Sequence, residues 1–416
     1  MSAKAQSRLG GPDFDRFVAG QAISSVGSAF TSFALPLLVY RLTGSALSLG
    51  LATAVTYLPY TIFGLVVGAW VDRADRKRLM ILSDVARALL IGTIAILQAF
   101  DVLSPGLLYV IIFASSSFTS LYLTAQMSAV PSLVAEDEIT AANGRVQASY
   151  ALAVAVGPLL ATALINLLPL SGLFACDALS FLASAALLLR IRRDFPARDD
   201  GRSLTLRAHV TEALHYVFTQ PLLRGISVLL VLVLFLASSA HAQLVLFAKQ
   251  RLDASDAEVG WLFSAGGVGL FVFAVAAGAL RKRLSMSAAM IGSVIVKGAC
   301  IALLGVTTSY GWALVLWGIG EGMTTLFSVN SMSARQLVSP PHMLGRVISI
   351  SQMLSWSTIP AGSLFGGFWV EFTHDVAGTY LTIGALVCGV GVAAAFSAVG
   401  RAERFLTTQR ALAGTA

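Results

Sequence analysis

Long, unbroken apolar runs dominate the chain, and short polar segments separate them. A helix needs only about 20 mainly apolar residues to cross the hydrocarbon core of a bilayer. The runs do not alternate apolar and polar residues, as the strands of a membrane barrel would. The pattern therefore predicts an all-α membrane protein. Its twelve transmembrane helices are expected at residues 14–40, 46–71, 79–100, 106–133, 145–168, 171–191, 222–247, 257–280, 284–306, 311–336, 346–371 and 376–399.

The composition supports a multi-pass protein in a lipid bilayer. Of the 416 residues, 56% are hydrophobic and 12% are charged, whereas soluble domains carry roughly 25% charged residues. A soluble protein could not keep so much apolar surface away from water. The polar start up to Arg16 and the long run after it do not match a signal peptide, so we expect no cleaved leader.

The distribution of Lys and Arg predicts the orientation. An even number of spans places both termini on one side, and the loops of that side hold 23 of the 28 Lys and Arg residues. The opposite loops hold Arg41, Lys249 and Arg251. Basic residues accumulate on the cytoplasmic side, so we expect cytoplasmic termini and a location in the cell (inner, cytoplasmic) membrane. The net charge of +7 then requires no nucleic acid partner.

The longest polar stretch, residues 192–221, lies between the sixth and seventh predicted spans. Its apolar residues recur with helical spacing, which predicts an amphipathic helix at the membrane surface with Ser203 as a suitable N-cap. These apolar residues are Leu206, Val210, Leu214 and Val217. We expect an N-terminal six-helix bundle (1–191), a cytoplasmic linker (192–221), and a C-terminal six-helix bundle with a short tail (222–416).

The two predicted bundles look like copies of each other. Arg41-Leu42 recurs 210 residues later as Arg251-Leu252, and Gly144-Arg145-Val146 recurs as Gly345-Arg346-Val347. The matches keep their order and their place relative to the spans. Two bundles related in this way can rock about a site between them and expose it to either side in turn. The duplication therefore favours a carrier of solutes over an enzyme or a receptor. Nothing in the sequence requires a partner chain, so we expect a monomer.

The loop after the second predicted span reads GAWVDRADRKR from Gly68 onward. It resembles the signature loop of the major facilitator superfamily, in which Gly, three residues, Asp and Arg precede a basic cluster. The stretches LPLLVYRLTGSALSLG (35–50), DALSF (177–181) and EALHYVFTQPLLRG (212–225) resemble the branch that contains the enterobactin and macrolide exporters. The resemblance implies export of an amphipathic small molecule by proton antiport. Ala153 and Ala161, where such exporters often carry Gly, argue against antiport but not against the fold.

The resemblance also implies a gate on the cytoplasmic side. Asp72 and Arg73 would latch the two bundles, supported by Gly68, Arg76 and Lys77. The alternative is that these basic residues only determine topology.

Three more charged residues lie near the cytoplasmic ends of the third and fifth spans: Asp84, Arg87 and Arg145. Asp84 and Arg87 are three residues apart and share a helix face, so they can pair. Two roles remain open for these residues: conformational gating, or a fixed structural pair.

The deepest charges are Glu321, near the middle of the tenth span, and Lys297 in the ninth. Both are about 12 residues from the turn between these spans, so a helical hairpin brings them to the same depth. Carboxylates at such depth are costly and usually functional. Two hypotheses follow: Glu321 carries protons and contacts the cargo, or it is a structural partner of Lys297.

Four other polar residues in spans are candidates. Asp177 in the sixth span serves either helix packing or proton transfer. Gln21 in the first span, and His241 and Gln243 in the seventh, lie on helices that line the central cavity in the family that the chain resembles. They would contact substrate there, or bond to neighbouring helices.

Motifs of other protein classes are missing from the sequence. It holds no GxxxxGK[ST] nucleotide loop and no HExxH or GxSxG motif, and its three cysteines are far apart. We therefore expect no enzyme activity, metal or cofactor; the partners are a small-molecule substrate, protons and the bilayer. The alternatives within the fold are a lysophospholipid or lipid translocator and a nutrient importer, and outside it a polytopic receptor or membrane-bound enzyme.

Overall fold

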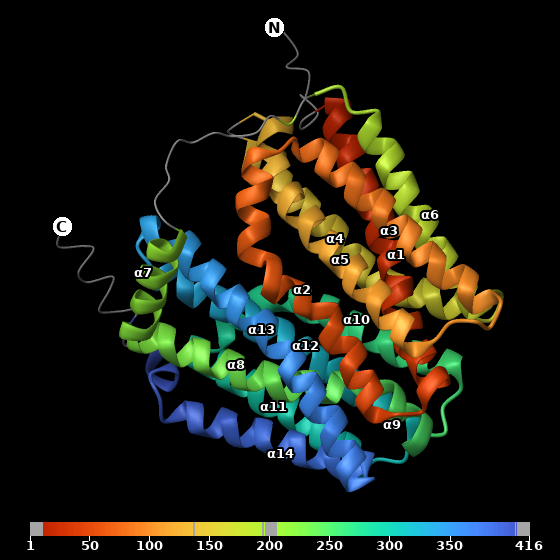
Figure 1. Ribbon diagram of the computed structural model, residues 1–416. Coiled ribbons are helices and arrows are strands. Elements are labelled where there is room, and N and C mark those ends of the chain that lie inside the picture. The colour runs from red at the N-terminus through yellow and green to blue at the C-terminus, as the bar shows by residue number, and fades with distance from the viewer. Residues whose placement is uncertain (1–10, 136–137, 194, 196–205, 404, 406–416) are drawn as a thin grey trace, which may run out of the picture. The chain divides into compact units, whose positions relative to one another are not determined.

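The computed structural model describes residues 11–135, 138–193, 195, 206–403 and 405 (Figure 1). Every described element is helical, which confirms the expected all-α class. The α-helices are α1 (Gly11–Thr43), α2 (Ala46–Arg73), α3 (Arg76–Ala99), α4 (Pro105–Leu133), α5 (Ile139–Leu164), α6 (Leu170–Leu189), α7 (Leu206–Thr219), α8 (Pro221–Ala242), α9 (Leu244–Arg251), α10 (Asp256–Arg283), α11 (Met286–Val306), α12 (Tyr310–Val338), α13 (Pro341–Thr373) and α14 (Val376–Ala395). A short 3-10 helix, Val399–Arg401, follows.

Eleven of the described helices are long and apolar enough to cross a membrane. They are α1 to α6, α8, α10 to α12, and α14. Helix α13 has 33 residues but is not among the eleven, because a polar stretch with Ser351, Gln352 and Ser355 interrupts its apolar residues. A twelfth span at α13 therefore stays a prediction.

The predicted span 222–247 is wrong in one respect, because the helix breaks at Gln243. Helix α8 ends at Ala242, and α9 begins at Leu244. The backbone of Gln243 has φ −94° and ψ 5°, outside the α-helical range, and its N–H bonds to the carbonyl oxygens of Ala240 and His241. The chain turns here because the side chain of Gln243 is buried and donates to the carbonyl oxygen of Ala46 at 3.0 Å.

The chain divides into two compact units. The first comprises residues 1–43 and 58–201, and the second comprises residues 44–57 and 202–416. In the first unit α1 packs against α5 and α6, while α3 packs against α4 and α6. In the second unit α11 packs against α12 and α14, α10 against α12, and α8 against α13. The first stretch of α2 belongs to the second unit, and the remainder belongs to the first.

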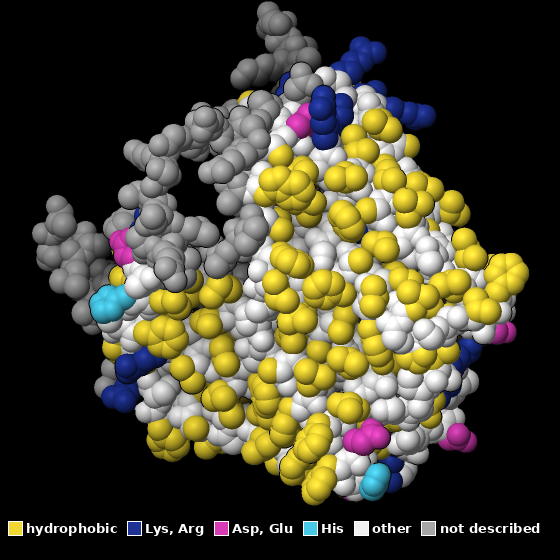
Figure 2. Space-filling view, in the orientation of Figure 1, with side chains coloured by type: hydrophobic (Ala, Val, Ile, Leu, Met, Phe, Trp, Pro, Cys, Tyr) yellow, Lys and Arg dark blue, Asp and Glu magenta, His cyan; other side chains and the backbone are white. Residues whose placement is uncertain are grey.

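Basic residues gather at one end of the first unit. Arg16 donates to the carbonyl oxygen of Arg190 at 3.2 Å, and Lys77 donates to that of Ile191 at 2.6 Å. The starts of α1 and α3 therefore lie beside the end of α6. Figure 2 shows Lys and Arg at this end (top) and hydrophobic side chains over the flank below it. A helix flank of this kind suits lipid, and the basic end is what the count of loop charges predicts for one membrane side.

The predicted amphipathic linker helix is present as α7 and packs against α13 in the second unit. Val217 is fully buried, and Glu212 forms an ion pair of 2.7 Å with Arg346. Ser203, the expected N-cap, lies outside the described residues. The helix is grouped with the second unit, and its role as a linker between two bundles stays a prediction.

Candidate functional site

The second unit contains a buried ion pair between α11 and α12. Lys297 Nζ lies 3.1 Å from Glu321 Oε1 and donates to Thr324 Oγ1 at 2.6 Å. The side chains are 7% and 17% exposed, respectively. The hairpin of α11 and α12 therefore brings the two charges together, as their equal depth predicts. Opposite charges offset part of the cost of burial in an apolar surrounding.

Close helix packing holds Glu321 in place. At Gly269 on α10, a Cβ atom would lie 1.9 Å from the carbonyl oxygen of Gly318 on α12, so only glycine permits this approach. One turn earlier on α10, a Cβ at Gly266 would meet the side chains of Trp317 and Glu321. The contact between the backbones of α10 and α12 fixes the axial position and the rotation of α12. It thereby also fixes the position of the Glu321 carboxylate.

His241 lies beside this pair, at the end of α8. Its ring is 5.6 Å from that of Trp317 and 6.2 Å from that of Phe263, centroid to centroid. It also interacts electrostatically with Glu321 and Lys297. Three ionisable side chains are therefore adjacent in the second unit, although sequence reasoning placed His241 only on a cavity-lining helix.

A cavity of about 360 Å³ opens next to the pair, within the second unit. Helices α8, α11, α12 and α13 line it; half of the lining residues are apolar, such as Leu230, Val233 and Phe327, and the exposed surface is mainly apolar. Its charged lining residues are Lys297 and Arg335. Such a volume lies within the range of about 300–1,000 Å³ that is usual for small-molecule sites. Sequence reasoning missed Arg335, because it counted this residue only among the basic residues of the cytoplasmic side.

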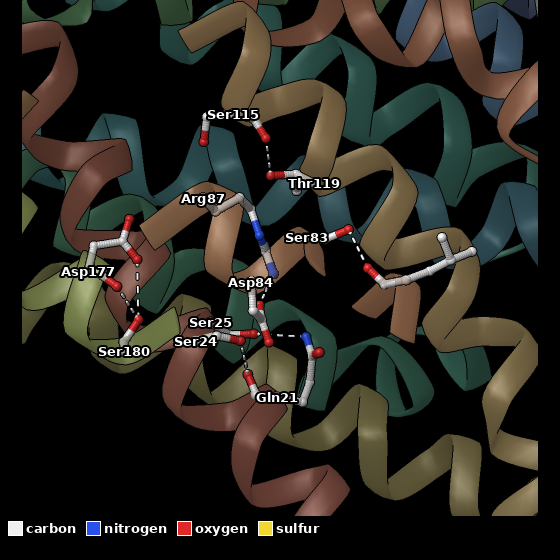
Figure 3. A network of polar contacts seen from close by, with 11 residues as sticks. Gln21, Ser24, Ser25, Ser83, Asp84, Arg87, Ser115, Thr119, Asp177 and Ser180 are labelled. Atoms are coloured by element: carbon white, nitrogen blue, oxygen red, sulfur yellow. Dashed lines mark hydrogen bonds and ion pairs between the residues drawn. The ribbon is translucent and has the colours of Figure 1, made fainter. Parts of the chain in front are cut away.

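The first unit has its own buried ion pair, between Asp84 and Arg87 on α3 (Figure 3). The expected local pair is therefore present. The guanidinium of Arg87 lies between two aromatic rings, 4.4 Å from the centroid of Tyr122 and 4.2 Å from that of Phe181. Cation–π contacts of this kind add to the ion pair and hold the arginine in one position.

Asp177 links two helices of the first unit. Its Oδ2 accepts a hydrogen bond of 2.5 Å from Thr31 on α1. Its Oδ1 accepts one of 3.3 Å from Ser180, which Figure 3 shows. The carboxyl group is buried, and its described bonding partners are neutral hydroxyls rather than cations. This geometry ties α6 to α1, and both expected roles, helix packing and proton transfer, stay predictions.

The two candidate glutamines are both buried. Gln21 donates to Ser25 Oγ at 3.1 Å, and its Oε1 has no hydrogen-bond partner among the described residues (Figure 3). Gln243 holds the start of α2 through Ala46. Neither lines the cavity of the second unit. The Oε1 of Gln243 likewise has no hydrogen-bond partner among the described residues, so contact with substrate stays a prediction for both side chains.

Three residues of the expected gate, Gly68, Asp72 and Arg73, lie outside the residues whose side chains the structure describes. Arg76 is buried at the start of α3, where Asp75 caps the helix by accepting from Lys77 N and Arg78 N. Arg145 forms an ion pair of 2.8 Å with Asp15 on α1, rather than joining Asp84 and Arg87. Sequence reasoning missed Asp15, because nothing in the spacing relates α1 to α5.

Long apolar helices, buried charge pairs and an amphipathic cavity together define a multi-pass membrane transporter. The chain belongs to the Major Facilitator Superfamily, whose family model matches residues 17–363. It is therefore a transporter rather than an enzyme.

Efflux proteins are among the relatives of the chain. Multidrug efflux pump Tap of Mycolicibacterium fortuitum is 25% identical, over 90% of this chain and 92% of Tap. Enterobactin exporter EntS of Salmonella choleraesuis (strain SC-B67) is 25% identical, over 91% of each chain. Macrolide efflux protein A of Streptococcus pyogenes is 30% identical, but over 42% of this chain and 43% of its own length. The resemblance to the enterobactin and macrolide exporters is thereby confirmed.

The fold is also that of solved transporters. A bacterial homologue of the human lysosomal transporter Spinster, in an inward-facing and unoccupied conformation, has a TM-score of 0.74 and 13% identity. The match covers 95% of this chain and 97% of that one. At this identity the likeness establishes the architecture alone.

Proposed function

We propose that the protein is a proton-coupled exporter, which moves an amphipathic small molecule out of the cytoplasm by alternating access. The observation that carries the proposal is the Lys297–Glu321 pair, because Lys297 both holds the carboxylate and lines the cavity. The efflux activities in the names of the relatives support the direction of transport. The protein would act as a monomer in the cytoplasmic membrane.

The ion pair suggests how protons and cargo are coupled. A proton taken up by Glu321 would neutralise the carboxylate and leave Lys297 without its counter-charge. The charge at the cavity wall would change at once, so protonation and cargo binding would influence each other through one side chain. His241 would be a candidate to receive or supply that proton, because it interacts electrostatically with both Glu321 and Lys297.

Residues of the first unit would then act in the conformational cycle. Asp72 and Arg73 would latch the cytoplasmic side, and Gly68, Arg76 and Lys77 would support them. The Asp84–Arg87 and Arg145–Asp15 pairs would hold α3 and α5 during the movement. Asp177 would keep α6 attached to α1.

A second candidate within the same fold is a lipid or lysophospholipid translocator. The mainly apolar lining of the cavity favours it, because an acyl chain could lie against α8 and α12. The two candidates differ in whether a proton gradient is consumed.

The proposal is tested by compound-induced proton movement in inside-out membrane vesicles that contain the protein. The compounds are macrolides, siderophores, dyes and lysolipids, and vesicles without the protein serve as the control. We expect some compounds to collapse the pH gradient, and Glu321→Gln to abolish that response. Glu138→Gln, at the N-cap position before α5, is the matched control and should leave the response unchanged.

Two results would count against the proposal. Full activity in Glu321→Gln would remove this carboxylate from the coupling step. Transport of a lysolipid without any proton movement would favour the translocator.

A further inference from the structure

One edge of a buried arginine in the second unit has no partner. Arg335, in the last turn of α12, is 6% exposed, and its Nη1 donates to Ser331 Oγ at 2.6 Å. Its Nε and Nη2 are buried and have no hydrogen-bond partner among the described residues. These two N–H groups lie on the same edge of the guanidinium. That edge is one with which arginine binds a carboxylate or phosphate through two parallel bonds.

Ordinary roles of a basic residue do not explain this geometry. An arginine that only determines topology extends its charged end into water. One that caps a helix end donates to the last carbonyl groups. Arg335 instead lies at the cavity wall, and its edge formed by Nε and Nη2 has no hydrogen-bond partner among the described residues. Buried cations without a counter-charge are expensive, so such an arrangement calls for a ligand.

The charge of the cavity points to the same kind of ligand. Lys297 and Arg335 are its charged lining residues, and none of the described lining residues is acidic. The charge of Lys297 is balanced by Glu321, whereas that of Arg335 has no described counter-charge. Ser351, Gln352 and Ser355 of α13 add polar groups to a lining that is otherwise mainly apolar. A net positive wall beside an apolar wall suits a molecule with an anionic head and an apolar body.

We propose that Arg335 binds the carboxylate or phosphate head of an amphipathic cargo, whose apolar part lies along α8 and α12. This inference rests on the proposed function as a carrier of amphipaths, and it narrows the cargo to anions.

The test is equilibrium binding by calorimetry, using the full-length protein in nanodiscs of neutral lipid. The probes share one octyl chain and differ in the head: octyl phosphate, octanoate, octyltrimethylammonium and octyl glucoside. Inorganic phosphate separates recognition of the head alone from recognition of the whole amphipath. We expect the two anionic probes to bind more tightly than the cationic and neutral ones.

The variants assign the binding to the guanidinium. Arg335→Gln should weaken octyl phosphate binding at least about tenfold, which corresponds to about 1.4 kcal/mol. Arg335→Lys keeps the charge but not the two-bond edge, so it should recover only part of that loss. Arg224→Gln, at an exposed position of α8, is the matched control and should bind like the wild type.

Equal binding of all octyl probes by the wild type would overturn the proposal, and this comparison needs no variant to fold. Unchanged octyl phosphate binding by a folded Arg335→Gln would also overturn it. The outcome is independent of proton coupling. Antiport of a cationic compound without octyl phosphate binding would refute only the anion site, and anion binding without antiport would refute only the proposed coupling.

Discussion

Arg87 and Lys297 are separated by 210 residues, the same separation that relates Arg41-Leu42 to Arg251-Leu252. Each is a buried cation in an ion pair, and each belongs to the third predicted span of its half. Their counter-charges differ. Arg87 pairs with Asp84 within α3, whereas Lys297 pairs with Glu321 on the following helix and lines a cavity. At matching positions of the two halves a buried cation recurs, but its carboxylate lies on the same helix in the first half and on the following helix in the second.

The pair of the first unit should therefore matter chiefly for stability. Removal of one partner from a buried ion pair typically costs about 3–5 kcal/mol, because the other charge remains buried. We expect Asp84→Asn to lower the melting temperature of the purified protein strongly. Arg78→Gln breaks the exposed pair with Asp75 and should cost less than about 1 kcal/mol. Equal melting temperatures for the two variants would contradict the structural role of the Asp84–Arg87 pair.

The pair of the second unit should show strong thermodynamic coupling. Lys297→Met and Glu321→Gln each leave one group without its partner, whereas the double variant leaves neither charge behind. We expect the double variant to be more stable than the sum of the single losses, by about 0.5–3 kcal/mol. Thermal unfolding of the four proteins measures this coupling. Simple additivity would mean that the two side chains do not interact in the membrane.

The close approach of α10 and α12 should tolerate no side chain at Gly269. Gly269→Ala would force a Cβ atom against the backbone of Gly318, and overpacking of this kind costs about 1–3 kcal/mol. Gly278→Ala on the same helix is the control, because nothing lies within 4 Å of the added Cβ. It should be neutral or stabilise α10 by up to about 1 kcal/mol. Melting temperatures of both variants check the prediction, and a harmless Gly269→Ala would contradict it.

Glu403 should make the stability of the second unit depend on pH. The backbone N–H and the hydroxyl of Ser287, at the start of α11, donate to its two carboxylate oxygens at 3.0 and 2.5 Å. Burial raises the pKa of Glu403, but the hydrogen bonds from Ser287, together with those from the backbone of Glu403 and Met286, outweigh it, so the net pKa lies below the ordinary value.

A lowered pKa in the folded state stabilises the protein above the pKa of the unfolded chain, near 4.3 for glutamate, and the effect disappears as the pH falls through the lower folded value. We expect Glu403→Gln to lose about 1 kcal/mol at pH 7 and to melt like the wild type in sufficiently acidic buffer. Melting curves between neutral and acidic pH test this. A constant difference between the two proteins across that range would argue against a carboxylate contribution.

The features that could be predicted are those that depend on apolar runs and on counting residues along the chain. Apolar runs predict helices well, because a lipid-exposed backbone must bond within its own segment. The depth of Lys297 and Glu321 followed from counting residues on either side of one turn. The break at Gln243 did not, because it depends on a bond to Ala46, nearly 200 residues away in the chain. The free edge of Arg335 depends on a side-chain conformation and on the helices around it, neither of which leaves a pattern in the sequence.

The polarity of α13 also affects how the chain enters the membrane during synthesis. A segment that carries Ser351, Gln352 and Ser355 is a poor substrate for insertion by the translocon on its own, because each polar group in lipid adds to the cost of transfer. The same residues face the cavity of the finished second unit, where helices already inserted can shield them from lipid. If α13 is the predicted twelfth span, we expect its insertion to depend on α8, α11 and α12 being in the membrane already. A truncated polypeptide that ends soon after α13 would test whether α13 inserts into the membrane once α8, α11 and α12 are there to shield its polar residues.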